Sequence, residues 1–126
     1  MKEPAEFLVL SRGQWDADAP AEAIQEAIDR FYAWHDRLVA EGRMRAGQRL
    51  APGRRLVTRQ GVLDGPYAEA KEVIGGYWHI LAADLDEAAA IAAQNPCLAF
   101  GLAFEIRPIE PVRASAYLVS CETSSR

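Results

Sequence analysis

A single apolar stripe along residues 20–41 constrains the fold more than any other feature of the sequence. Its members recur at steps of three and four residues, which is typical of a helix with one buried face. They are Ile24, Ala27, Ile28, Phe31, His35, Leu38 and Val39. Asp18 is expected to cap this helix, Pro20 to occupy its first turn and Gly42 to end it. We therefore predict one long helix that packs against another layer.

Segments typical of β-strands lie on both sides of this helix. They are short, contain Val, Leu and Ile, and are separated by turn signals such as Pro-Gly and Gln-Gly. The predicted strands are 6–10, 44–50, 56–59, 62–64, 73–83 and 102–109, with 116–120 as one further candidate. In the longest of them, His79 and Trp78 should face opposite sides, and Gly75-Gly76 near its start indicates a bulge.

A second helix is predicted over residues 84–94. Asp84 can cap it, and Glu87 three residues later comes close to a capping box. Asn95-Pro96 ends it, because a residue before proline avoids the helical region. The elements follow the order β-α-β-β-(β)-β-α-β with no repeat and no linker, so we expect residues 1–126 to form a single domain.

This order predicts an α+β fold, namely a ferredoxin-like antiparallel sheet with two helices on one face. Two helices can cover only one face of the sheet. The other face would carry large apolar groups such as Trp78 or Tyr77, depending on the register. Because an uncovered apolar face needs a partner, we expect a two-fold homodimer in which two sheets face each other.

The charge and hydropathy of the chain argue against two classes of partner. It has 126 residues and a formal net charge of −4, whereas phosphate binding needs clustered Lys and Arg. Arg54 and Arg55 lie beside a turn and are interpreted as part of a solvated hairpin. No apolar stretch approaches the ~20 residues that span a bilayer. We therefore expect a cytoplasmic protein that binds neither nucleic acid nor membrane.

The two cysteines do not indicate a metal site. Cys97 and Cys121 are far apart and lack the spacing of metal ligands. In a reducing compartment they are predicted to be free thiols, with Cys97 buried in the core. Together with the lack of a nucleotide-binding loop, this leads us to expect no metal and no cofactor.

Several ordered motifs resemble those of one known family. The run from Asp64 to Glu72, which reads Asp-Gly-Pro-Tyr-Ala-Glu-Ala-Lys-Glu, is similar to the signature of the YCII-related DGPF family. The other matching segments are Gly75-Gly76-Tyr77, Asp84-Leu85-Asp86-Glu87-Ala88, Asn95-Pro96 and Glu105-Ile106-Arg107-Pro108-Ile109. The resemblance covers residues 6–109, which it marks as the domain core, and leaves 110–126 as a C-terminal extension.

The resemblance implies a dimeric α+β barrel but little about activity. Some members resemble products encoded beside extracytoplasmic-type sigma factors, which makes such a factor a candidate partner. The wider group is thought to use a His-Asp pair, but the first predicted strand contains no histidine, so that pair cannot be assigned here. Tyr67 replaces the usual phenylalanine and adds a hydroxyl group to the motif.

The motif itself supplies most of the candidate site residues. The side chain of Asp64 can organise the Gly65-Pro66 turn by bonding to backbone N–H groups. Alternatively, the turn can direct Asp64 and Tyr67 into a cleft. The carboxylates of Glu69 and Glu72 would share one side of a helical turn, with Lys71 close to both. Two neighbouring carboxylates can raise one pKa for acid–base work, whereas a solvated charged loop is the alternative.

Two further residues are candidates on predicted strands. His79 could transfer protons or could be a hydrogen-bonded structural residue. Arg107 could bind an anion or could pair with Glu105. His35 is interpreted as a core histidine, and Trp15, Trp34 and Trp78 as core or interface residues.

Three classes of function follow from these candidates. The first is a small-molecule enzyme or binder with a cleft beside the segment from Asp64 to Glu72. Its candidate catalytic residues are Asp64, Glu72 and His79, and its candidate binding residues are Tyr67, Glu69, Lys71, Glu72 and Arg107. The second is a non-catalytic partner of a sigma factor, and the third is a structural dimer without a ligand. The sequence leaves open whether the protein is an enzyme.

Overall fold

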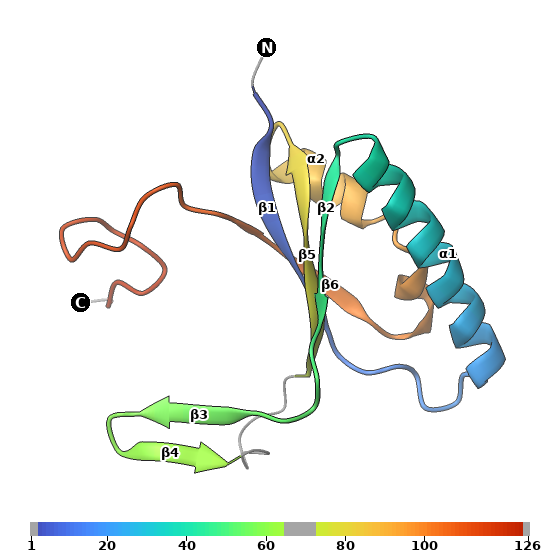
Figure 1. The fold of residues 1–126 in the computed structure, drawn as a ribbon, viewed down its shortest axis with the longest axis horizontal. Coiled ribbons are helices and arrows are strands. Elements are labelled where there is room, and N and C mark those ends of the chain that lie inside the picture. Colours follow the sequence, from blue (N-terminus) through green and yellow to red (C-terminus); the bar gives the residue numbers. More distant parts are fainter. Residues whose placement is uncertain (1–2, 65–72, 125–126) are drawn as a thin grey trace.

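The computed structural model describes residues 3–64 and 73–124, and its elements follow the predicted order (Figure 1). They are β1 (Ala5–Arg12), α1 (Ala21–Ala40), β2 (Met44–Arg49), β3 (Arg55–Thr58), β4 (Gly61–Asp64), β5 (Ile74–Ala82), α2 (Leu85–Ala92), the 3₁₀ helix η1 (Pro96–Phe100) and β6 (Ala103–Pro108). The six strands predicted up to residue 109 and both helices are confirmed, with bounds shifted by one or two residues at some ends.

Four strands form an antiparallel sheet in the order β2-β5-β1-β6. Both helices lie against the same side of this sheet, and the other side has no helix over it (Figure 1). The predicted α+β fold with a ferredoxin-like sheet is therefore confirmed. Within the described residues, β3 and β4 pair only with each other, in a separate hairpin.

The strand register fixes which side chains form the core. On β1 and β5, Phe7, Val9, Trp78 and Ile80 face the helices and are buried, as strand alternation requires. The core cluster is completed by Trp34, Leu38, Met44, Ala82, Ala88, Ile91 and Ala92. Each large apolar side chain buried in this way contributes about 1.5–3 kcal/mol to folding. The face without helices, called here the open face, carries Glu6, Leu8, Leu10, Arg12, Arg45, Tyr77, His79, Leu81, Glu105 and Arg107.

Two bulges interrupt the sheet at the same end. Gly75 is the extra residue where β5 pairs with β1, as Gly75-Gly76 had indicated. On β2, Arg45 pairs with His79 but Gln48 pairs with Tyr77, so two residues oppose Trp78 alone. An extra residue reverses the inward–outward alternation of a strand. Arg49 therefore pairs with Gly76 on the helix side, where regular alternation would have placed it on the open face.

The helix ends agree with prediction except at the start of α1. Its N-cap is Pro20 without a side-chain cap, so the prediction that Asp18 caps the helix is wrong. Asp18 lies instead in a turn closed by a bond from the Ala19 N–H to the Asp16 carbonyl oxygen. Gly42 follows the helix at φ 75°, a left-handed conformation that glycine adopts without strain. At α2, the Asp84 side chain accepts a 2.8 Å bond from Glu87 N–H, as predicted.

The chain after β6 contains neither helix nor strand up to residue 124, so the prediction of a strand at 116–120 is wrong. Its apolar side chains, such as Tyr117 and Val119, are 97% and 88% exposed. A strand needs a neighbour for its backbone hydrogen bonds, and this segment leads away from the sheet (Figure 1). Within residues 3–64 and 73–124, no helix is long and apolar enough to cross a membrane.

Candidate functional site

A cavity of about 250 Å³ lies on the helix side of the sheet, against α1 and the bulged ends of β2 and β5. Its wall is mostly apolar and aromatic. It consists of Ser11, Trp15, Ile28, Phe31, Tyr32, His35, Gly47, Gln48, Arg49, Gly76, Tyr77, Trp78, Cys97, Leu102 and Phe104. A concave, largely apolar space with a few polar groups is the usual form of a small-molecule site.

Arg49 provides the positive charge of this wall. The β2 bulge turns it toward the helix side, where its guanidinium lies beside two glycines of β5 and the residue stays exposed to solvent. A Cβ atom at Gly75 would come within 3.0 Å of Nη2, and one at Gly76 within 3.3 Å of Nη1. The absence of side chains at these positions leaves room for the guanidinium. None of the described residues that line the cavity is an aspartate or a glutamate.

His35 belongs to both the core and the cavity wall. Its ring stacks on Phe31 with centroids 5.4 Å apart and meets Trp78 edge-on at 5.9 Å. Its Nδ1 lies 3.2 Å from the sulfur of Met44. Burial lowers the pKa of His35, and the charge of Asp36 opposes that effect only in part. The ring is therefore neutral at neutral pH, consistent with the core histidine inferred from the sequence.

The lowered pKa of His35 predicts that the protein loses stability in mild acid. The unfolded chain takes up this proton near the ordinary value of 6.5, whereas the folded protein resists it until a lower pH. Stability from this group is complete above 6.5 and falls as the pH decreases toward the folded pKa, by at most about 1.4 kcal/mol per pH unit. Urea unfolding at pH 7.5 and 5.5 should show a smaller loss for His35→Phe than for wild type. Equal losses would contradict this assignment.

Cys97 belongs to η1 and lines the cavity. Its thiol contacts the Ala27 carbonyl oxygen at 3.8 Å, and Asn95 accepts a bond from its backbone N–H. Burial raises the pKa of Cys97, while the positive charges of Arg49 and Arg30 act in the opposite direction. The thiol is thus protonated, and its buried position in the core confirms the prediction for Cys97. Cys121 is exposed, and both cysteines are free.

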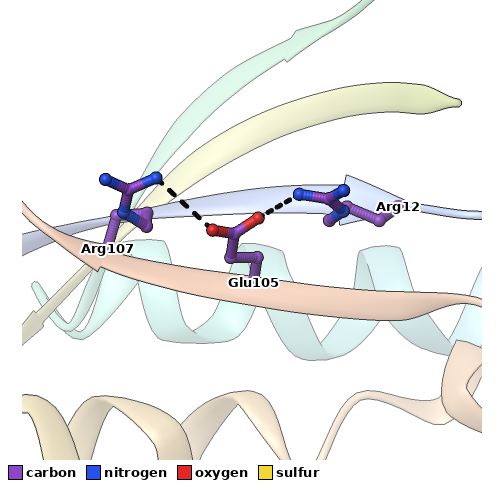
Figure 2. A network of polar contacts seen from close by, with 3 residues as sticks. All are labelled: Arg12, Glu105 and Arg107. Carbon is purple, nitrogen blue, oxygen red and sulfur yellow. Dashed lines mark hydrogen bonds and ion pairs between the residues drawn. The ribbon is translucent and has the colours of Figure 1, made fainter. Parts of the chain in front are cut away.

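A charge network occupies the open face. The carboxylate of Glu105 pairs with Arg12 on one side and with Arg107 on the other, the latter at 3.4 Å (Figure 2). The ion pair between Arg107 and Glu105 that the sequence suggested is therefore present. His79 lies on the same face, beside Tyr77 at a ring distance of 6.1 Å. Arg107 and His79 thus face away from the cavity.

The structure brings together a different set of residues from the predicted site. Tyr67, Glu69, Lys71 and Glu72 lie outside the described residues, and their roles stay predictions. Asp64 ends β4, but its side chain also lies outside what the structure describes. The cavity includes Arg49, which sequence reasoning missed because a bulge sets its direction. The signal available was Gly47, a glycine inside a predicted strand.

The family model for the YCII-related domain matches residues 6–113, which is most of the chain. A search of curated proteins found no match. Within the described residues, no group of three or more His, Cys, Asp or Glu side chains is placed to hold a metal ion.

Proposed function

This chain belongs to the YCII-related domain family, and we propose that it binds a small polar molecule in the cavity between α1 and the sheet. The observation that carries this proposal is Arg49, an exposed cation that a bulge turns toward the helix side, where it lines an aromatic cavity beside two glycines. Such a group can orient a polar ligand while the apolar wall buries the rest of it. Catalysis is a further step that this proposal leaves open.

The cavity lies at the end of the sheet where β5 follows the family motif. Gly76, in its wall, comes four residues after Glu72 in the sequence. Just before β5, the carbonyl oxygen of Val73 accepts a 2.9 Å bond from Gly13 N–H, which ties this strand start to the end of β1. That a cleft lies beside the segment from Asp64 to Glu72 stays a prediction from the sequence, as do the roles of Tyr67, Glu69, Lys71 and Glu72.

A cavity-filling variant tests this proposal. Ile28 lines the cavity from α1, so the indole of Ile28→Trp should occupy the space that a ligand needs. Melting temperatures of wild type and variant are measured against a panel of polar metabolites. Compounds that bind stabilise the folded state by RT ln(1 + [L]/Kd). We expect stabilising compounds for wild type and loss of their effect in Ile28→Trp.

The matched control is Ile24→Trp, one helical turn earlier. Ile24 is half-buried on the same helix but does not line the cavity. This variant should respond to the same compounds as wild type. If the panel yields no stabilising compound, or if Ile28→Trp responds as fully as Ile24→Trp, the proposed site is wrong.

We also propose that the open face forms a homodimer interface. Leu8, Leu10 and Leu81 are half-buried on this face, and neither helix covers them. A second copy related by a two-fold axis would bury the same face from both sides. The single-domain extent 1–126, a cytoplasmic location and a partnership with an extracytoplasmic-type sigma factor stay predictions from the sequence.

A further inference from the structure

We infer that the ligand of this cavity is a small planar anion, an aromatic or conjugated carboxylate, and that Arg49 is its anion anchor. The inference rests on the proposed function, because it names the chemical class of molecule that the same cavity takes. Charge, the geometry of Arg49 and the shape of the wall support it independently.

The charge of the wall favours an anion. Arg49 is its charged side chain, and none of the described lining residues is acidic. His35 is neutral at neutral pH and does not alter this balance. Arg49 is exposed to solvent, so water partly screens its attraction for an anion, but no carboxylate among the described lining residues opposes it. A cationic ligand would be repelled by Arg49, and no acidic side chain among the described lining residues would compensate for that repulsion.

The position of Arg49 favours a carboxylate over a point-like anion. Its planar guanidinium presents donors in a fork that matches the two oxygens of a carboxylate. The guanidinium lies 3.0–3.3 Å from the positions that Cβ atoms would take at Gly75 and Gly76. Nη2 and Nη1 lie 3.0 and 3.2 Å from the Gly75 position, whereas Cζ lies 3.5 Å from it, so the edge that carries both terminal nitrogens points toward the β5 backbone. A ligand carboxylate would then use the other edge, which carries Nε and one terminal nitrogen.

The aromatic wall favours a flat ligand of limited size. The ring centroid of Trp78 lies 5.0 Å from that of Phe31 and 5.6 Å from that of Phe104, with ring planes tilted by 56° and 53°, so the wall offers both ring faces and ring edges. Trp15 and Tyr32 add two further aromatic side chains to the wall. Aromatic rings prefer offset-stacked or edge-to-face contacts with other rings. A volume of about 250 Å³ is below the range of drug-sized sites and suits one or two fused rings.

Two isosteric probes test the charge preference by calorimetry. The first is 2-naphthoate, and the second is 2-naphthamide, which keeps the rings but carries no charge. We expect wild type to bind the carboxylate at least tenfold more tightly than the amide. Arg49→Gln should bring the two affinities within about twofold, and Arg49→Lys should give an intermediate preference because it keeps the charge but loses the fork.

The control is Arg45→Gln, which removes an arginine from the same strand on the opposite face. Arg45 pairs with Glu6 at 3.2 Å on the open face. This variant should keep the full preference for the carboxylate. A preference that survives Arg49→Gln, or equal binding of both probes to wild type, would overturn the inference. If wild type binds both probes equally and Ile28→Trp binds neither, the inference about the anion is wrong but the proposed cavity stands. If wild type binds neither probe, the inference is wrong. The metabolite panel then tests the proposed cavity separately.

Discussion

The Gly47→Ala variant is expected to lose about 3 kcal/mol or more of folding free energy, because a methyl group at this position has no space. A Cβ atom at Gly47 would overlap the carbonyl oxygen of Tyr77 and come within 2.9 Å of the Trp78 Cα atom. These are backbone atoms of a central strand, so no rotamer change can relieve the overlap. Relief requires β2 to separate from β5 or to abandon its bulge, and either change would displace Arg49. Thermal unfolding should show a decrease in Tm of about 10 °C or more.

Gly53→Ala is the matched control for this prediction. Gly53 lies between β2 and β3, and a Cβ atom there would have no heavy atom within 4 Å. Its φ angle lies outside the positive range in which a side chain is strained. We expect its Tm to stay within a few degrees of wild type. A Gly47→Ala variant as stable as Gly53→Ala would show that the β2 bulge is not built as described.

The second large effect is expected at the proposed dimer interface. Leu8→Asp should convert a dimer of twice the 13.9 kDa chain mass into a monomer of that mass. An isologous interface would receive two buried carboxylates from one substitution, and each burial costs several kcal/mol when the group is unpaired. The monomer itself should tolerate the new carboxylate, because Leu8 is only half-buried and no helix covers this face, so water can solvate the charge. Light scattering at micromolar concentration measures the mass directly.

Leu98→Asp provides the control for the interface. Leu98 is 43% exposed on η1, which packs against α1 on the helix side of the sheet. Its substitution should leave the mass of the wild-type dimer unchanged. A monomeric wild type would refute the dimer proposal. A Leu8→Asp variant that remains dimeric would place the interface elsewhere.

The element order and the buried faces could be predicted because they follow from local periodicity. The apolar stripe of α1 and the alternation along β5 each specify one buried side. In β5, Trp78 is buried against the helices and His79 lies on the open face, which are the opposite sides that the alternation required. The same logic placed Asp84 at the start of α2, where its carboxylate bonds to the backbone.

The cavity could not be predicted because it depends on a local exception to periodicity. Alternation alone assigns Arg49 to the open face, and the bulge at Gly47 reverses that assignment. Glycines inside strands mark such exceptions without showing which residue is extra. Residues 116–120 illustrate the opposite limit. Their apolar composition resembles that of a strand, but no neighbouring strand is present to pair with them in the described part of the chain.

The most direct test of a ligand site between α1 and the sheet is a crystal structure of the protein with the most strongly stabilising compound from the metabolite panel. The predicted result is electron density for the compound against Trp78 and Phe31, with an acidic group within hydrogen-bond distance of the Arg49 guanidinium. Density for the compound on the open face, beside Arg107 or His79, would contradict the account.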